Sequence, residues 1–163
     1  MPYSSLAIAN EFIGRALAST GDGLTQMQVQ KLVYLAHGWN LGAYDEALIE
    51  DQVEAWKFGP VIHNLYSALS RYGNQPIDHQ INWGEDTVLL DSDDDGPAQE
   101  DLAEWETAVI DMVWDIYGDY PAWKLSALTH QNGTPWSRTY QDGLKRVIPN
   151  KVIAGHFQEL LAD

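Results

Sequence analysis

The sequence predicts a mainly α-helical fold, with about six helices in one compact domain and a small two- or three-stranded β-sheet. Three observations lead to this prediction. The 163 residues fit one domain of about 100–200 residues. Apolar side chains recur at spacings of three and four over long stretches, which is the period of a helix. Alternating apolar and polar residues, typical of strands, occur only in short segments. We therefore expect residues 1–163 to form a single domain.

Four long segments carry the helical spacing. The first spans residues 5–19. The second follows Thr25, which has Gln28 three residues later, the spacing of a capping box. Its later turns are apolar almost all round, so we expect this helix to be central and buried. The other two are residues 99–117 and the segment that follows Pro149.

Shorter elements are predicted between these helices. Pro60 suits the first position of a helix over residues 61–72, and Gly73 suits its C-terminal end. A second short helix is expected over residues 121–128, and residues 132–136 indicate a turn. The candidate strands are part of 47–56, 77–81 and 87–90.

Several classes of function are excluded by what the chain lacks. It has no Cys, so disulfides, thiolate zinc sites and cysteine nucleophiles are ruled out. No phosphate loop, dinucleotide glycine motif or nucleophile elbow occurs, and no two His are spaced i, i+4. We therefore expect no enzyme, no cofactor and no stoichiometric metal. Apolar runs fall short of the ~20 residues of a membrane span, so a cytoplasmic protein without a membrane partner is expected.

The charge is large and uneven. The formal net charge is −15, and 14 acidic but no basic residues lie between Arg71 and Lys124. Few side chains can neutralise phosphates, so a nucleic-acid partner is not expected. The negative region is expected to attract a basic or locally basic protein, and a purely solubilising role is the alternative. The candidate partner-binding residues are Trp83, Asp93, Asp94, Asp95 and Trp105.

Four titratable residues have both a structural and a functional interpretation. Lys31 lies in the helix predicted to be buried, where an unpaired charge is costly. An ion pair with a carboxylate is therefore expected there, unless the side chain extends to solvent. His37, His63 and His130 are expected to be structural. A hydrolase that uses one of them with a nearby carboxylate is the open alternative.

Three segments, in order, resemble the signatures of the Panacea domain, also called the SocA-like antitoxin or phage-associated GepA-like domain. They are residues 31–41 (KLVYLAHGWNL), residues 53–61 (VEAWKFGPV) followed by Tyr66, and residues 125–136 (LSALTHQNGTPW). The resemblance covers about residues 6–161, and the middle segment is the most specific. His63 stands where the family favours Pro, which affects only the start of a helix.

The resemblance implies an antitoxin of a toxin–antitoxin system, of the kind found in prophages, that neutralises a cognate protein toxin by direct binding. The SocA branch implies an alternative, an adaptor that delivers the toxin to a Clp-type protease. The signatures are expected to act as scaffold, while variable surfaces select the toxin. The signature residues are Lys31, Tyr34, Trp39, Trp56, Gly59, Pro60, Tyr66, Thr129, His130, Pro135 and Trp136. One expected cluster orders the chain at residues 58–59, and its members are Trp56, Pro60, Tyr66 and Trp136.

Overall fold

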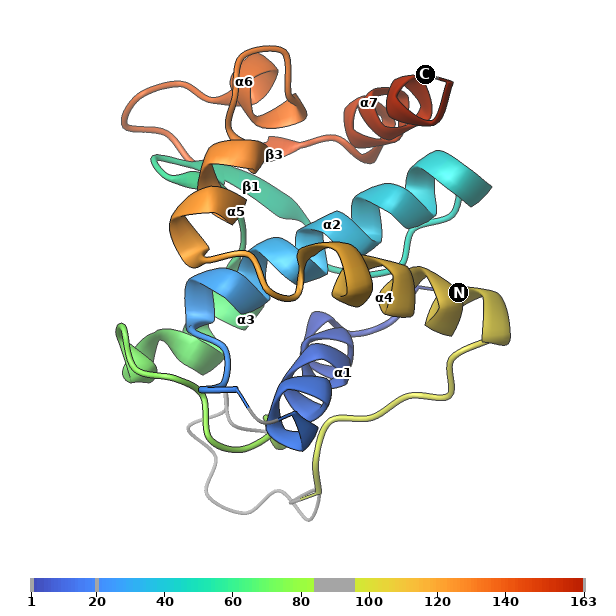
Figure 1. Cartoon of the computed structure of the whole chain (residues 1–163). Coiled ribbons are helices and arrows are strands. Elements are labelled where there is room, and N and C mark those ends of the chain that lie inside the picture. Colours follow the sequence, from blue (N-terminus) through green and yellow to red (C-terminus); the bar gives the residue numbers. More distant parts are fainter. Residues whose placement is uncertain (1, 20, 84–95, 163) are drawn as a thin grey trace.

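Helix α2 lies in the middle of the molecule, and the other elements pack around it (Figure 1). The structure is a computed structural model that describes residues 2–19, 21–83 and 96–162. Within these residues it has seven α-helices, one 3-10 turn and three strands. In chain order they are α1 (Ser5–Ala18), α2 (Gln26–Tyr44), β1 (Val53–Trp56), β2 (Gly59–Ile62), α3 (His63–Leu69), the 3-10 turn η1 (Ser70–Tyr72), α4 (Glu104–Tyr117), α5 (Ala122–Thr129), α6 (Pro135–Thr139), β3 (Arg146–Ile148) and α7 (Asn150–Ala162). The mainly helical fold with a small sheet is confirmed.

The start of α2 follows from its capping box, as the sequence predicts. The Thr25 side chain accepts from the Gln28 backbone N–H, and the Gln28 side chain accepts from the Thr25 backbone N–H. These two bonds satisfy donors that have no partner inside the helix. The helix is buried on nearly all sides because it contacts α1, α4, α5, α7 and β2. Its prediction as the central helix is confirmed.

Close contact between α2 and α7 depends on Gly38. A Cβ atom at this position would lie 2.2 Å from the Phe157 ring, a distance that no packing tolerates. The ring fills that space and meets Trp39 edge to face, with centroids 5.0 Å apart. Glycine at 38 thus allows a bulky aromatic side chain of α7 to sit against the backbone of α2.

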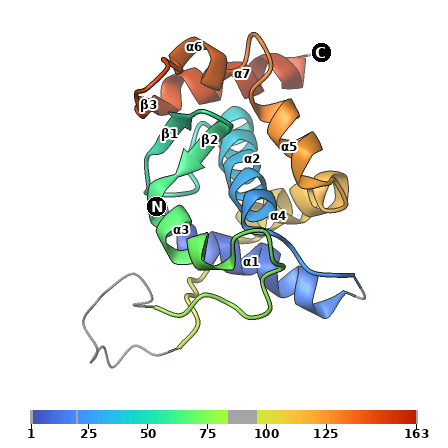
Figure 2. The same cartoon turned by 90° about the vertical axis from the view of Figure 1, so that its left-hand side faces the viewer.

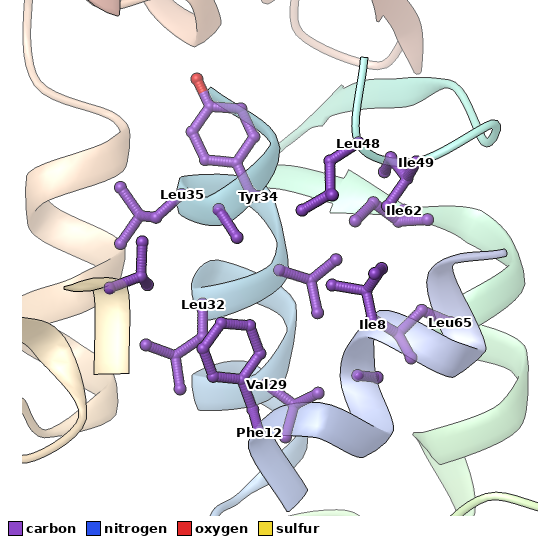
Figure 3. Packing of buried hydrophobic residues seen from close by; sticks show 14 of the residues in the cluster. Ile8, Phe12, Val29, Leu32, Tyr34, Leu35, Leu48, Ile49, Ile62 and Leu65 are labelled. Atoms are coloured by element: carbon purple, nitrogen blue, oxygen red, sulfur yellow. The ribbon is translucent and has the colours of Figure 1, made fainter. Parts of the chain in front are cut away.

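The hydrophobic core lies where α1, α2 and α3 meet the sheet (Figure 3). Figure 3 shows Phe12 of α1 close to Val29 and Leu32 of α2, and Ile8 of α1 close to Ile62 of β2. All five side chains are fully buried. Burying such a side chain contributes roughly 1.5–3 kcal/mol each, so this cluster fixes the sheet against the helices.

The sheet is antiparallel and has the order β2-β1-β3. Strands β1 and β2 form a two-residue hairpin in which Trp56 pairs with Gly59, and β3 returns from far along the chain so that Ile148 pairs with Val53. Figure 2 shows the hairpin beside α2, and β2 also contacts α5. The third strand of the sheet is therefore one that the sequence of residues 146–148 did not predict.

Two predicted boundaries around the hairpin are wrong. Pro60 does not open a helix but lies in β2, paired with Ala55, and α3 begins only at His63. Strand β2 is an edge of the sheet, where a residue without an N–H is tolerated. Residues 132–136 are not only a turn, because Thr134 accepts from the Ser137 N–H and caps α6, which begins at Pro135.

The predicted helix over residues 99–117 begins later, at Glu104. The preceding chain is extended because it is bound to α1: the backbone N–H of Ser4 donates to Glu100, 2.7 Å away. The Glu106 side chain then accepts from the Ala103 N–H and fixes the start of α4.

The predicted strand over residues 77–81 does not form. The buried side chain of Asn10 instead binds both the N–H and the carbonyl of Ile81, and it also donates to the Ala98 carbonyl. Among the described residues, the backbone pairing around Ile81 is limited to a bond from the Ala98 N–H to the Ile81 carbonyl and one isolated bridge between Asn82 and Pro97, and the Asn10 amide binds the remaining Ile81 N–H. The other predicted strand, residues 87–90, lies outside the described residues.

Candidate functional site

Three side chains from three helices bind the hairpin of β1 and β2 at the carbonyls of three alternate residues. Trp136 of α6 donates to the Trp56 carbonyl at 2.5 Å, Ser126 of α5 to the Phe58 carbonyl at 2.9 Å, and Lys31 of α2 to the Pro60 carbonyl at 2.8 Å. These bonds connect the three signature segments to one another. The expectation that the signatures act as scaffold has a concrete geometric basis here.

Gly59 is needed at the bend between these bonds for two reasons. Its φ of +120° is a backbone conformation that L side chains rarely adopt. A Cβ atom there would also lie 3.0 Å from the Lys31 Nζ and 3.4 Å from the Thr129 hydroxyl. Because glycine has no side chain, the backbone of the hairpin can lie in direct contact with the Lys31 side chain.

Two aromatic side chains of the middle signature, Trp56 and Tyr66, lie at the surface side of the hairpin. The Trp56 ring lies 4.9 Å from Tyr66, and the Lys145 ammonium lies 4.0 Å from the Trp56 ring centroid. Tyr66 is 40% exposed and Trp56 is half-buried. Contacts of Trp56 with Tyr66 and with Trp136 are therefore present, but the cluster is partly open to solvent.

The second group of signature residues packs inside. Tyr34 is buried and meets Phe157 edge to face. The Thr129 hydroxyl donates to the Leu125 carbonyl within α5, and the His130 ring lies 5.2 Å from Trp136. These residues hold α5 and α6 in the positions from which they bind the hairpin.

Lys31 does not form the ion pair that the sequence predicts, nor does it extend to solvent. It is 2% exposed, and among the described residues its amine has one hydrogen-bond acceptor, the Pro60 carbonyl. No carboxylate in this part of the chain is paired with it. Burial lowers the pKa of Lys31 to about 7, because a low-dielectric environment disfavours the charged form.

Lys31 also lines a cavity, which we call the lysine pocket. Its volume is about 420 Å³, within the range of small-molecule sites. Its wall is mostly apolar and comes from the start of α2, the hairpin, α3 and the start of α5. The lining residues are Thr25, Gln26, Met27, Gln30, Lys31, Trp56, Lys57, Phe58, Val61, Tyr66, Gly73, Asn74 and Ala122.

The opposite end of α2 carries a different surface, which we call the acidic aromatic surface. Tyr44 and Trp105 are 49% and 38% exposed, and their ring centroids are 4.6 Å apart. Figure 1 shows the last turn of α2 and the first turn of α4 at the same side of the molecule. Four exposed acids adjoin the two rings in the sequence. They are Asp45, Glu46, Asp101 and Glu104.

The candidate partner-binding residues are thus not all brought together. Trp105 is exposed as required, whereas Trp83 is half-buried and packs against the core. Asp93, Asp94 and Asp95 lie outside the described residues. The aromatic partner of Trp105 is Tyr44, which the sequence did not single out.

Two of the three His residues of the hydrolase alternative, His37 and His130, have contacts typical of a structural role. The Nδ1 atom of His37 accepts from the backbone N–H groups of Leu48 and Ile49, and its Nε2 lies 3.0 Å from the Asn150 side-chain oxygen. Burial lowers the pKa of His37, so the neutral ring fits this set of partners. His63 is exposed at the start of α3, and His130 contacts Trp136 and the Ser126 carbonyl.

Within residues 2–19, 21–83 and 96–162 there is no group of three or more His, Asp or Glu placed to hold a metal ion. In the same part of the chain, no helix combines the length and the apolar character needed to cross a membrane.

Comparison with known proteins identifies the class. The family described as Antitoxin SocA-like, Panacea domain matches residues 29–137. Antitoxin SocA of Caulobacter vibrioides (strain NA1000 / CB15N) is 31% identical over 162 residues, which cover 93% of this chain and 81% of that protein. No solved structure matches. The chain belongs to the SocA-like antitoxin family with a Panacea domain, and the resemblance seen in the sequence is confirmed.

Two residues that fasten the hairpin were not singled out from the sequence. Gln30 binds both the N–H and the carbonyl of Ile62 through its side-chain amide, and Ser126 holds the Phe58 carbonyl. Gln30 precedes Lys31 in a buried helix, and a buried amide needs partners. A polar Gln30 in a helix predicted to be buried was therefore the signal in the sequence that could have identified this residue.

Proposed function

We propose that this protein is an antitoxin that neutralises a cognate protein toxin by direct binding, and that the toxin docks on the acidic aromatic surface. The family and the relative named Antitoxin SocA support the antitoxin role. The proposal contains no catalytic step and no cofactor.

The exposed ring pair of Tyr44 and Trp105 is the observation that supports this docking position. Trp and Tyr are enriched among the few residues that dominate binding energy in protein interfaces. Here they protrude together from two helices whose other faces are buried in the core. An aromatic pair held on rigid helices loses little conformational freedom on binding.

The charge around the pair supports a basic partner. Asp45, Glu46, Asp101 and Glu104 are all exposed, and the nearby part of the chain belongs to the stretch without a basic residue. Complementary charge accelerates encounter and suppresses wrong partners more than it increases final affinity. The aromatic pair would supply the binding energy and the acids the orientation.

The test compares two exposed tryptophans. The probe is the purified product of the toxin gene in the same operon, and its affinity is measured by calorimetry. Trp105→Ala is expected to weaken binding by about tenfold to a hundredfold, as for an interface residue worth about 1.4–2.8 kcal/mol. Trp123→Ala is the matched control, because Trp123 is 72% exposed but lies at the start of α5.

Unchanged affinity of Trp105→Ala would contradict the docking position, and loss in Trp123→Ala alone would move the interface to α5. The same purified components separate neutralisation from delivery to a protease. Direct neutralisation inhibits the toxin with no protease present, whereas an adaptor leaves the isolated toxin active.

A further inference from the structure

We propose that the lysine pocket is a binding site for a small carboxylic acid with an apolar body, and that Lys31 is the residue that receives the carboxylate. The site is separate from the acidic aromatic surface, and the inference does not rest on the proposed docking of a toxin. Three features of the pocket support this assignment. They are the unused donors of the amine, the apolar wall, and the size of the cavity.

The Lys31 amine has hydrogen-bonding capacity that the described protein does not use. A lysine ammonium has three donors, and here one of them is bound to the Pro60 carbonyl at 2.8 Å. A buried charge without a counter-ion is costly. A carboxylate that entered the pocket would supply both the missing acceptors and the missing charge.

The neighbouring polar group of the pocket is already satisfied. The Gln30 side chain uses its oxygen on the Ile62 N–H and its nitrogen on the Ile62 carbonyl, each at 3.0 Å. Lys31 is therefore the buried polar group in the lining with donors to spare. An acceptor, rather than a donor, is the chemistry that this arrangement selects.

The apolar wall of the pocket favours a ligand whose remaining part is apolar. Met27, Phe58 and Tyr66 are exposed members of the lining and Val61 is a buried one, so a ligand would pass apolar side chains before it reached the lysine. One amine balances one negative charge. A monocarboxylate is thus favoured over a phosphate, whose second charge would have no buried partner.

The cavity volume of about 420 Å³ accommodates a ring or a short aliphatic chain with one carboxylate. The hairpin keeps the pocket in shape, because its carbonyls at Trp56, Phe58 and Pro60 are all bound to helices. A pocket that is formed before the ligand arrives binds without the cost of ordering a loop.

The test uses two probes with the same phenyl body, of which one ends in a carboxylate and the other in a neutral hydroxyl group. Phenylacetate and 2-phenylethanol are titrated into the wild-type protein, and the indole N–H signal of Trp56 is followed by NMR after assignment with Trp56→Phe. Phenylacetate is expected to shift the signal and to bind at least tenfold more tightly than the alcohol, because hydrogen bonds to charged groups contribute about 1.5–3 kcal/mol.

Two variants assign the preference to one amine. Lys31→Met keeps an unbranched side chain of nearly the same length and removes the amine, and it is expected to bind both probes equally. Lys57→Met is the matched control, since Lys57 lines the same pocket but is exposed, and it is expected to keep the preference for the acid.

Three results would overturn the proposal. They are equal binding of the two probes to the wild-type protein, no shift of the Trp56 signal with either probe, and an undiminished preference in folded Lys31→Met. The first two need no variant, so the proposal stays testable if Lys31→Met does not fold.

Discussion

The lysine pocket and the acidic aromatic surface lie at opposite ends of α2, and they are built in different ways. The pocket is bounded by the hairpin, and hydrogen bonds connect this hairpin to α2, α5 and α6. Among the described residues, the exposed rings of Tyr44 and Trp105 meet only through a side-chain contact. A change in the first region therefore propagates to several elements, whereas a change in the second stays local.

This difference separates the part of the fold that can vary from the part that cannot. Side chains that bind backbone carbonyls, such as Trp136 and Ser126, determine where whole helices lie. Exposed rings on the outer side of helices can be exchanged with little effect on the core. We therefore expect the fold to tolerate substitution of the second kind of residue better than of the first kind.

The largest loss of stability is expected from a substitution in the hairpin of β1 and β2. Trp56→Ala removes the ring that contacts Tyr66 and Lys145. Replacing a buried Trp costs about 3–5 kcal/mol, and the half-buried position of Trp56 places the expected loss near 3 kcal/mol. Urea unfolding measures it, and toxin binding should be lost in parallel.

Trp105→Ala is the companion variant for this comparison. Its unfolding free energy should change by less than about 1 kcal/mol, while its toxin affinity falls. A stable, fully binding Trp56→Ala protein would show that the hairpin is not structural. A strongly destabilised Trp105→Ala protein would remove the distinction between the two regions.

A second, smaller loss is expected from Gly59→Ala. The new Cβ would face the Lys31 amine at 3.0 Å in a backbone conformation with φ of +120°. Such strain costs roughly 1–3 kcal/mol. Gly96→Ala serves as the control, because no atom lies within 4 Å of the added Cβ there, and equal stability of the two variants would contradict the close contact with Lys31.

The sequence predicted the helices better than the connections between them. Repeated apolar spacing identified α1, α2, α4 and α7, because burial of one helix face is a local pattern. Strand β3 pairs with β1 across more than 90 residues, and residues 146–148 carry no alternation that predicts a strand. The error at Pro60 has the same cause, since Gly-Pro suits a helix start and an edge strand equally well.

The site could be predicted only in part. The signature segments identified the residues that converge on the hairpin, but their bonds to backbone carbonyls are invisible in a sequence. Lys31 illustrates the limit: an apolar helix predicts that the lysine is buried, and electrostatics then favours a carboxylate partner. The structure provides the Pro60 carbonyl instead, which depends on where a hairpin from another part of the chain lies.

The buried lysine predicts an effect of pH on stability. Lys31 has a pKa of about 7 in the folded protein, against 10.5 for a free lysine. Between these values the unfolded chain binds more protons than the folded one, so the free energy of unfolding rises with pH. We expect a gain of about 1 kcal/mol between pH 7 and 8, and Lys31→Met should show no such gain.

The useful range of this measurement ends near pH 10. The hydrogen bond from Tyr3 to Glu106, together with burial, raises the pKa of Tyr3 to about 12. Above pH 10 the unfolded chain therefore loses a proton that the folded protein keeps, and stability falls. Burial also lowers the pKa of His37 from 6.5, so this histidine adds to the rise below about pH 7. Denaturation from pH 7 to 9.5 therefore reports mainly on the lysine, and a wild-type curve without the rise would contradict the burial of Lys31 without a carboxylate partner.

The smallest effect concerns the rate at which the toxin binds. Asp101→Asn with Glu104→Gln removes two exposed charges beside Trp105, and Asp93→Asn with Asp94→Asn and Asp95→Asn removes three from the sequence tract. Each set is expected to slow association a few-fold, and to flatten its dependence on salt, if the charges steer a basic partner. Dissociation should change little, because the rings and not the acids hold the complex.

Stopped-flow association at low and high salt measures both sets side by side. An effect of the first set alone assigns steering to the acidic aromatic surface, and an effect of the second set alone assigns it to the tract. Unchanged rates in both sets would mean that the acids only keep the protein in solution, and the charge argument for a basic toxin would fail while the Trp105 test still stood.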